Sequence, residues 1–289
     1  MSATLLALAT GCGGSSSANG GTEVLYFSAI PDANKSDLAE KYGRIAEHLS
    51  QELGVPVEYR PSSSYAASVE AFKNGDVQLA WFGGVTGVQA RKAVPGAQAI
   101  AQGRVDPEYK SYFIAHRDTG LTRSEAFPVG LEGKSFTFGS PDSTSGRVMP
   151  EFFIRESTGR SPEEVFGHPN KFSNGHDLTA LQVQAGTVDA GALSYKKYDS
   201  MIASGDLDPE VCVIVWETPA YPDYNWTAHP ALEERFGAGF TGRVAETLVA
   251  ITDEELLGAL DRPEGLIPAT NADFAAIEDT MVVLGMARN

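Results

Sequence analysis

The feature that most constrains the fold is a repeated alternation of short apolar runs with amphipathic segments. The run Val24–Ile30 predicts a buried strand, and from Leu38 to Leu53 apolar residues recur at three- and four-residue steps, which indicates an amphipathic helix. Gly54 ends this helix before a second predicted strand at Val55–Tyr59. Further strands are predicted at Asp76–Phe82, Ala97–Gln102, Ser111–Ala115, Ser135–Gly139, Val188–Leu193 and Val211–Trp216. Strands that alternate with helices in this way predict an α/β fold.

The alternation falls into two units, which predicts two compact lobes. Residues 116–134, with their Asp, Gly and Pro, separate the units as a crossover segment, and the composition changes again from Thr218. Within the second unit a helix is expected from Ser145 or Gly146 to Glu156. No sequence period of roughly 20 to 50 residues is present, which argues against a solenoid.

The charge balance limits the possible partners. The chain of 289 residues has 38 acidic against 22 basic side chains, a formal net charge of −16. An extended nucleic-acid surface is not expected, because a phosphate backbone demands dense Lys and Arg. Apolar runs stay well short of the roughly 20 residues that a membrane-spanning helix needs. Any bound anion is therefore expected to be held locally, by a few directed groups.

The N-terminal segment is typical of a processed leader. Residues 2–10 are apolar and small, and Cys12 follows in a loose lipobox that would make it the lipidated first residue of the mature chain. Ala9 stands where an aliphatic residue is usual, and a basic start is missing, which indicates a truncated signal. Residues 13–21, GGSSSANGG, predict a flexible tether. We expect residues 1–22 to be leader and tether, and the protein to be extracytoplasmic and anchored by lipid only; an incidental cysteine is the alternative.

One polar turn concentrates the candidate chemistry. The segment Ser135–Pro150, SFTFGSPDSTSGRVMP, predicts a strand, a loop of Ser, Asp and Thr, and then a helix. In an open α/β sheet such a loop lies beyond the carboxyl end of a strand, where ligands usually bind. Ser143, Thr144 and Ser145 would present hydroxyls beside the unpaired N–H groups and positive dipole end of a helix, which suits a small oxyanion without any lysine. An ordinary Ser/Thr cap, satisfied internally, is the alternative and the commoner case for such a turn taken alone.

Several ordered motifs, spread through almost the whole chain, carry a resemblance to a known family. They are SYA at Ser64–Ala66, AWFGG at Ala80–Gly84, Tyr109 with Ser111, STSG at Ser143–Gly146 followed by Pro150, NGH at Asn174–His176, VDAGA at Val188–Ala192 and TPAYPDYNW at Thr218–Trp226. The chain resembles the phosphate-, phosphite- and phosphonate-binding solute receptors of bacterial ABC importers, and most closely a branch labelled putative selenate-binding.

The resemblance implies a type 2 periplasmic-binding fold, in which two α/β lobes joined by two strands close on a ligand in the cleft. The implied division is lobe 1 at residues 23–117 plus 218–289 and lobe 2 at residues 118–217. Hinges are expected near residues 116–118 and 216–219. The implied partners are a small oxyanion and the permease of an ABC importer. The protein is expected to be a monomer that needs no cofactor or metal.

The resemblance also implies seven ligand-binding residues from the two lobes: Tyr65, Tyr109, Ser143, Thr144, Ser145, His176 and Asp223. An imidazole at position 176 would donate to the anion and gain a proton from the bound charge. Without the resemblance, His176 would be interpreted as a helix cap or a surface residue. Tyr65 and Tyr109 would be interpreted as core packing.

Asp223 bears on the identity of the anion. A carboxylate repels a fully ionised ligand but accepts a hydrogen bond from one that keeps a proton. At neutral pH phosphate, phosphite and many phosphonates hold or exchange such a proton, whereas sulfate and selenate hold none. Asp223 in the site would therefore favour a phosphorus oxyanion, although Tyr224 or Asn225 could occupy its place. Relatives that bind aminoalkyl phosphonates carry an acid soon after the strand that matches VDAGA, and the corresponding stretch here reads Ser194, Tyr195, Lys196, Lys197, so a small ligand without an amino tail is expected.

Two other functions stay open on the sequence. A hydrolase would use Ser143 or Ser145 as nucleophile with His176 and Asp177, but the chain has no GxSxG, GxxxxGK[ST] or HExxH motif, so an enzyme is not expected. A ligand-sensing module on the same fold is the stronger rival, because nothing in the sequence separates delivery of a ligand from sensing it.

Overall fold

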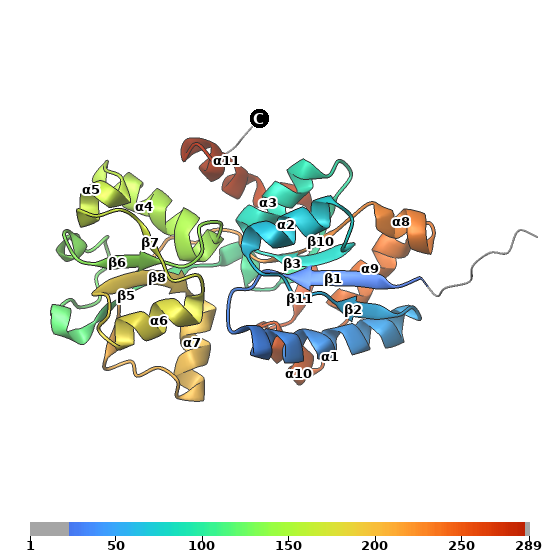
Figure 1. The fold of residues 1–289 in the computed structure, drawn as a ribbon, viewed down its shortest axis with the longest axis horizontal. Coiled ribbons are helices and arrows are strands. Elements are labelled where there is room, and N and C mark those ends of the chain that lie inside the picture. Colours follow the sequence, from blue (N-terminus) through green and yellow to red (C-terminus); the bar gives the residue numbers. More distant parts are fainter. Residues whose placement is uncertain (1–22, 287–289) are drawn as a thin grey trace, which may run out of the picture.

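Two α/β lobes lie side by side in the structure, a computed structural model that describes residues 23–286 (Figure 1). Each lobe is built on one mixed β-sheet with helices on both faces. The two-lobe α/β fold predicted from the sequence is confirmed. Cys12 and the expected tether lie outside the described residues. Within residues 23–286, no helix is both long enough and apolar enough to cross a bilayer.

The first sheet has six strands in the order β11-β4-β10-β3-β1-β2. In it, β1 runs parallel to β2 and β3, β10 runs antiparallel to β3 and β4, and β11 runs antiparallel to β4. Its strands are β1 (Leu25–Ala29), β2 (Val57–Tyr59), β3 (Leu79–Phe82), β4 (Gln98–Gly103), β10 (Asn225–Ala228) and β11 (Leu266–Pro268). The helices of this lobe are α1 (Lys35–Leu53), α2 (Tyr65–Lys73), α3 (Gly84–Ala93), the short η1 (Asp106–Glu108), α8 (Ala231–Phe236), α9 (Phe240–Val249), α10 (Glu254–Ala259), η5 (Asn271–Phe274) and α11 (Ala275–Val283).

The second sheet has five strands in the order β7-β6-β8-β5-β9. In it, β6 runs parallel to β7 and β8, and β5 runs antiparallel to β8 and β9. Its strands are β5 (Ser111–His116), β6 (Phe136–Phe138), β7 (Lys171–Phe172), β8 (Ala190–Ser194) and β9 (Cys212–Glu217). The helices of this lobe are η2 (Arg117–Thr119), η3 (Val129–Leu131), the π-helical turn η4 (Thr144–Val148), α4 (Met149–Thr158), α5 (Pro162–Phe166), α6 (His176–Gln184) and α7 (Tyr195–Ser204).

Local sequence signals explain how these elements begin and end. The apolar stripe of α1 is buried, as its period predicted: Leu38, Tyr42, Ile45, Leu49 and Leu53. Gly54 ends that helix in the left-handed conformation, with φ of 69°. Ser161 and Glu164 form a capping box at the start of α5. These signals act within a few residues, so they are legible in the sequence.

The strand β5 lies in the second sheet, which corrects the expected lobe boundary. The sequence placed Ser111–Ala115 in the first lobe and the division after residue 117. In the structure β5 pairs with β8 and β9 along its whole length. An apolar strand carries no mark of which sheet it joins, and its partners lie far along the chain, so only the fold reveals this pairing.

Both crossings between the lobes run through one hydrogen-bonded pair of segments. The N–H of Tyr109 donates to the carbonyl of Tyr221 at 2.9 Å, and the N–H of Tyr221 donates back at 3.0 Å. The N–H of Thr218 donates to the carbonyl of Ser111 at 3.1 Å. The first crossing therefore lies at residues 109–111, earlier than the expected 116–118, and the second at residues 218–221, close to the expected 216–219.

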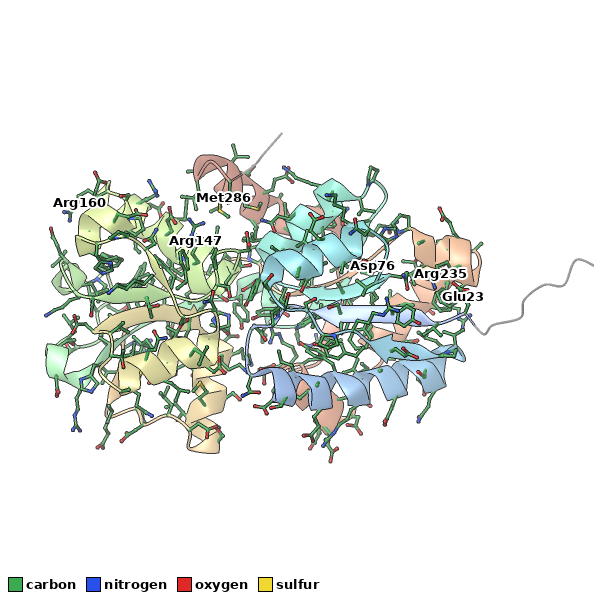
Figure 2. All side chains as sticks on the ribbon, in the orientation of Figure 1. Glu23, Asp76, Arg147, Arg160, Arg235 and Met286 are labelled. Atoms are coloured by element: carbon green, nitrogen blue, oxygen red, sulfur yellow. The ribbon has the colours of Figure 1, made fainter. Side chains whose placement is uncertain are left out.

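The lobes also touch on both sides of the junction, away from the crossings. Near α11, the Arg147 guanidinium of the second lobe donates to the sulfur of Met286 at 3.1 Å, and Figure 2 shows these two side chains at the top of the junction. On the side of α7 and α10 (Figure 1), the Lys197 ammonium pairs with the Asp261 carboxylate at 3.1 Å. Contacts between protein groups thus connect the described lobes on both sides of the junction.

Candidate functional site

The Ser/Thr turn predicted as the centre of the site lies between β6 and α4. Ser143 caps the turn, since its Oγ accepts from the N–H of Gly146 at 3.0 Å. Thr144–Val148 then form one π-helical turn that leads into α4, whereas the sequence predicted an ordinary helix from residue 145 or 146. The internal-cap alternative is correct for the Ser143 hydroxyl. Within residues 23–286, however, the N–H groups of Thr144 and Ser145 have no acceptor, so the turn keeps two donors at a helix start.

A second helix start meets this turn from the other lobe. Helix α3 begins at Gly84, directly after the AWFGG motif, and the Gly84 N–H donates to Oδ1 of Asp223 at 2.9 Å. The next N–H, that of Val85, donates across the lobes to Oγ1 of Thr144 at 3.0 Å. A Cβ on Gly83 would lie 3.0 Å from Thr144 Oγ1 and 3.2 Å from Asp223 Oδ1, so the glycine permits this close approach. Two positive dipole ends from different lobes therefore converge on one small region.

His176 reaches the same region from the first residue of α6. Its ring lies against the turn, because a Cβ on Gly146 would come within 3.0 Å of His176 Cε1. Nδ1 accepts from the N–H of Ser194 at 3.2 Å, and a main-chain N–H can only donate, so Nδ1 carries no proton. The neutral ring therefore holds its proton on Nε2, which is buried and has no partner among the described residues.

Burial keeps this histidine neutral. Desolvation lowers the pKa of His176 to about 4, although Asp32 opposes the effect. The expectation that His176 gains a proton from the bound charge needs correction, since Nδ1 is occupied by the Ser194 N–H. His176 is instead a neutral donor of fixed tautomer.

Asp223 supplies the complementary group. It is 1% exposed, and burial raises its pKa to about 7, while the Gly84 N–H and the hydroxyls of Thr144 and Ser145 oppose the rise. Oδ1 accepts from Gly84, and Oδ2 has no partner within the described part of the chain. A carboxyl group that titrates near neutral pH either accepts or donates a hydrogen bond through Oδ2.

The two other residues considered for this position are already occupied. Asn225 Oδ1 accepts from Arg91 and Thr227, at 2.9 and 2.7 Å. The hydroxyl of Tyr224 donates to Oδ2 of Asp32 at 2.8 Å. Of the three candidates in this loop, Asp223 has the free oxygen at the junction.

The two predicted tyrosines differ in their connection to the turn. Tyr65 begins α2, and its hydroxyl lies beside Ser143, whose hydrogen bond partly offsets the burial that raises the pKa of Tyr65. The hydroxyl of Tyr109 bonds to Oγ of Ser194, the residue whose N–H fixes His176. All seven predicted residues are buried, none more than 4% exposed: Tyr65, Tyr109, Ser143, Thr144, Ser145, His176 and Asp223. The structure thus gathers six of them around the turn and links Tyr109 through Ser194.

A groove of about 620 Å³ opens beside this cluster, between the lobes. Tyr65 and the loop around Ser140 form part of its wall, and residues of both lobes line the rest, among them Asn34, Asp142 and Asn174. Of the seven predicted ligand-binding residues, Tyr65 is the one that lines this groove.

The geometry does not form a hydrolytic triad. Asp177 Oδ1 accepts from the N–H of Leu178 at 2.8 Å instead of orienting His176. The Nδ1 of His176, which an orienting carboxylate would need, is bonded to the Ser194 N–H. Among the described residues, no three His, Cys, Asp or Glu side chains are grouped to hold a metal.

Sequence reasoning missed several groups that build the site. Ser194 fixes both His176 and Tyr109, and Ser111 Oγ donates to the carbonyl of Ser145 at 2.7 Å. These roles depend on contacts between distant segments and leave no local pattern. The start of α3 did leave one, because a buried strand followed by Gly-Gly at a helix start is a known arrangement for binding anions.

Comparison with known proteins identifies the family of the chain. A family model described as ABC transporter, phosphonate, periplasmic substrate-binding protein matches residues 27–274. A probable ABC transporter phosphite-binding protein from Prochlorococcus marinus (strain MIT 9301) is 37% identical over 229 residues, which cover 78% of this chain and 77% of the relative. The phosphate-import protein PhnD from Mycolicibacterium smegmatis is 31% identical over an alignment 317 positions long, which covers 96% of this chain and 92% of the relative.

Solved structures extend the comparison to the fold. The structure of PhnD1 from Prochlorococcus marinus (MIT 9301) in complex with methylphosphonate matches with a TM-score of 0.85 and 34% identity, over 91% of this chain and 99% of that one. The aliphatic sulphonate-binding protein SsuA from Escherichia coli, 14% identical with a TM-score of 0.58, shares the fold over 92% of this chain and 87% of its own. The chain belongs to the periplasmic substrate-binding proteins of phosphonate ABC transporters, a family of binding components and not of enzymes.

Proposed function

We propose that this protein captures a small tetrahedral phosphorus oxyanion that keeps one proton, and delivers it to the permease of an ABC importer. One observation carries the proposal: two buried polar atoms at the lobe junction, Nε2 of His176 and Oδ2 of Asp223, have no partner among the described residues. The first is a fixed donor and the second an acceptor at alkaline pH. A singly protonated oxyanion offers the matching pair, one ionised oxygen and one P–OH group.

Neutral dipoles hold the charge of the ligand. The N–H groups of Thr144 and Ser145 and the dipole ends of η4 and α3 surround the anion, so no Lys or Arg is needed at the contact. Each charge-assisted hydrogen bond contributes about 1.5 to 3 kcal/mol in a desolvated cleft. A few such bonds account for tight binding in a chain whose net charge is −16.

Closure of the lobes completes the site. His176 and the Ser/Thr turn belong to the second sheet's lobe, whereas Tyr65 and Asp223 belong to the first. A ligand that contacts both lobes binds the closed form better and shifts the population toward it. The permease then recognises the relative orientation of the lobes.

The relatives support the ligand class. Their names and structures give phosphite, phosphate and methylphosphonate as ligands of those proteins. Lys197 pairs with Asp261, so the position where amine-binding relatives carry an acid is positive here, and an amino tail would meet repulsion. We propose a tailless ligand, with selenate as the competing anion. We also propose lipid anchoring through Cys12 and a monomeric state.

Calorimetric titration at pH 7 tests the proposal, because phosphite and methylphosphonate still hold part of their last ionisable proton there and Asp223 is partly ionised. Phosphite, phosphate and methylphosphonate are expected to bind at least about tenfold more tightly than sulfate and selenate, because ionised Asp223 accepts from P–OH and repels a fully ionised anion. Asp223→Asn is expected to reduce the difference in affinity between the phosphorus oxyanions and sulfate or selenate. Asp177→Asn makes the same change at the rim of the cleft and is expected to leave that difference in affinity unaltered. Sulfate or selenate binding as tightly as phosphite would refute the proposal. Loss of uptake on deletion of the gene would separate delivery from sensing.

A further inference from the structure

Asp106 and Arg262 form the most deeply buried ion pair among the described residues, with side chains 0% and 2% exposed. Arg262 Nε and Nη2 donate to Asp106 Oδ2 and Oδ1 at 2.8 and 2.7 Å, a bidentate pair. The N–H of Gly103 donates to Oδ2 at 2.7 Å. Nη1 donates to the carbonyls of Leu260 and Asp261 at 3.2 and 3.0 Å. Every nitrogen of the guanidinium is thus engaged by protein acceptors, so Arg262 is not itself a ligand-binding group.

The guanidinium supports the aromatic wall of the junction. Its carbon lies 4.7 Å from the ring centre of Tyr224, 5.2 Å from that of Tyr109 and 5.6 Å from that of Trp81. Tyr224 stacks on Trp81 and packs at a tilt on Tyr109, so the three rings form one cluster around the cation. Arg262 therefore fixes Tyr109, whose hydroxyl is bonded to Ser194 beside His176.

Asp106 reaches the site through its main chain. Its carbonyl accepts from the N–H of Asp223 at 3.0 Å. Asp223 follows the second crossing between the lobes, and Tyr109 belongs to the first. One buried pair thus holds both chain segments at the point where they enter the cleft.

We propose that Asp106 and Arg262 are positioning residues for anion specificity: they fix the main chain of Asp223 and the ring of Tyr109, and their opposite charges act on the Asp223 carboxyl without touching the ligand. The charge arm of this inference concerns the protein alone. The positioning arm, which concerns phosphite affinity, rests on the proposed function, because it assumes that Asp223 contacts the anion.

The charges around Asp223 give the inference its signature. The titratable hydroxyls that face it stay neutral, because burial raises their pKa well above the usual value: Tyr65, Tyr109, Tyr221 and Tyr224. Asp106 is the charged neighbour, and after desolvation it adds to the rise in the pKa of Asp223. Removing the Asp106 charge is therefore expected to lower the pKa of Asp223. Arg262 helps to keep Asp106 ionised, since burial raises the pKa of Asp106 and the guanidinium lowers it. Without the Arg262 charge, Asp106 is expected to take up a proton, so the pKa of Asp223 is expected to fall as well, but by less, because no cation is left unpaired.

Carbon-13 NMR of the Asp223 carboxyl in ligand-free protein tests the charge arm, with the signal assigned from its loss in Asp223→Asn. Asp106→Asn is expected to shift the titration midpoint down by about half a pH unit or more, and Arg262→Met to shift it down by less, because Asp106 then takes up a proton. Arg262→Lys keeps the charge and is expected to keep the midpoint. A purely structural pair would leave the midpoint where it is, so equal midpoints in Asp106→Asn and the unmodified protein would overturn the inference.

Titration with phosphite tests the positioning arm. Arg262→Lys loses the planar fork and the contact with the rings, so its affinity is expected to fall about tenfold although the charge is kept. Arg155→Met is the control. Arg155 and the buried Glu151 both belong to α4 of the second lobe, away from Arg262, and two guanidinium nitrogens of Arg155 donate to Glu151 Oε1 at 3.0 and 2.9 Å. The control is expected to lower Tm without altering phosphite affinity or the Asp223 midpoint. Unchanged affinity in Arg262→Lys would overturn this arm.

The two proposals fail in different ways. If the unmodified protein binds no phosphorus oxyanion while the Asp223 midpoint still moves down in Asp106→Asn, the proposed function is wrong and the charge relation stands. If phosphite binds but the midpoints and affinities match those of the control, only the inference is wrong. Should Arg262→Met fail to fold, Asp106→Asn and Arg262→Lys still give distinct expected results.

Discussion

At the scale of single residues, the site depends on protons that are held in place. His176 presents a proton because the Ser194 N–H occupies its other nitrogen, and Asp223 keeps or releases one near neutral pH. One of these buried groups donates a hydrogen bond and the other, when ionised, accepts one. We expect this pair to select a ligand that carries a proton on one oxygen and none on another, a distinction that net charge alone does not make. Under the proposed function, this would separate phosphorus oxyanions from fully ionised anions of the same shape.

The raised pKa of Asp223 predicts a pH-dependent stability. Because the folded value of about 7 exceeds the unfolded value of 3.8, the contribution of this group is fully present below pH 3.8 and is lost as the pH rises through about 7. The ligand-free protein is expected to lose up to about 4 kcal/mol of unfolding free energy from this group over that window. Urea unfolding at pH 5 and pH 8 measures the loss. Asp223→Asn should show a smaller decrease than the unmodified protein, and equal decreases would contradict the prediction.

At the scale of elements, the site is a meeting of helix starts. Helix α3 enters from the first lobe and η4 from the second, and they share the hydrogen bond from Val85 to Thr144. Single-residue signals fixed both starts: Gly-Gly in one case and a Ser cap in the other. Hydroxyls and N–H groups at such ends replace the lysines that a strongly acidic chain lacks at this site.

Removing hydroxyls from the turn tests its part in binding. Ser143→Ala combined with Ser145→Ala is expected to weaken phosphite binding by at least about tenfold, because the cap of the turn and the hydroxyl beside Asp223 are lost together. Calorimetry measures the affinity, and circular dichroism checks that the fold persists. An affinity equal to that of the unmodified protein would remove both residues from the site.

A glycine substitution tests the close approach of α3 to the turn. In Gly83→Ala the new Cβ would lie 3.0 Å from Thr144 Oγ1, so closure is hindered and affinity is expected to fall several-fold. Gly43→Ala in α1 is the matched control, since its Cβ meets nothing within 4 Å and alanine favours a helix. Equal phosphite affinity in the two variants would show that the approach at Gly83 is not tight.

Much of the fold and of the Ser/Thr turn could be predicted from the sequence. The contacts between distant segments could not, for a physical reason. The strands, α1, the α5 capping box and the Ser/Thr turn follow from short-range patterns. Local chemistry cannot place β5 in a sheet or bring Arg262 to Asp106, because those partners meet only after the chain has folded. The tautomer of His176 could not be predicted for the same reason, since the N–H of Ser194 in strand β8 determines it.

At the scale of the whole molecule, ion pairs connect the two lobes, and we expect them to favour a closed arrangement. On the side of α7, Lys196 pairs with Glu264 and Lys197 with Asp261, each joining the second lobe to the first. These groups lie outside the cluster around the turn, so their effect on the ligand passes through the equilibrium between open and closed forms.

A charge exchange tests this bias. Lys196→Glu and Glu264→Lys are each expected to weaken phosphite binding about threefold or more, and the double variant to recover most of the loss, because the pair is restored in reverse. Glu132→Lys is the control, since Glu132 pairs with Arg160 inside the second lobe. Titrations at low and high salt measure the effect, which salt should reduce. Failure of the double variant to recover affinity would exclude a pairwise contribution.

The ladder between Tyr109 and Tyr221 has a consequence for how the length of this chain can change. The two crossing segments are hydrogen-bonded to each other, so each one sets the register of the other. Side chains on extended segments alternate between opposite faces. One inserted residue in either segment would slip its register and turn the side chains beyond it to the wrong face, Asp223 among them. We therefore expect insertions to be tolerated in the outer loops but not in one crossing alone.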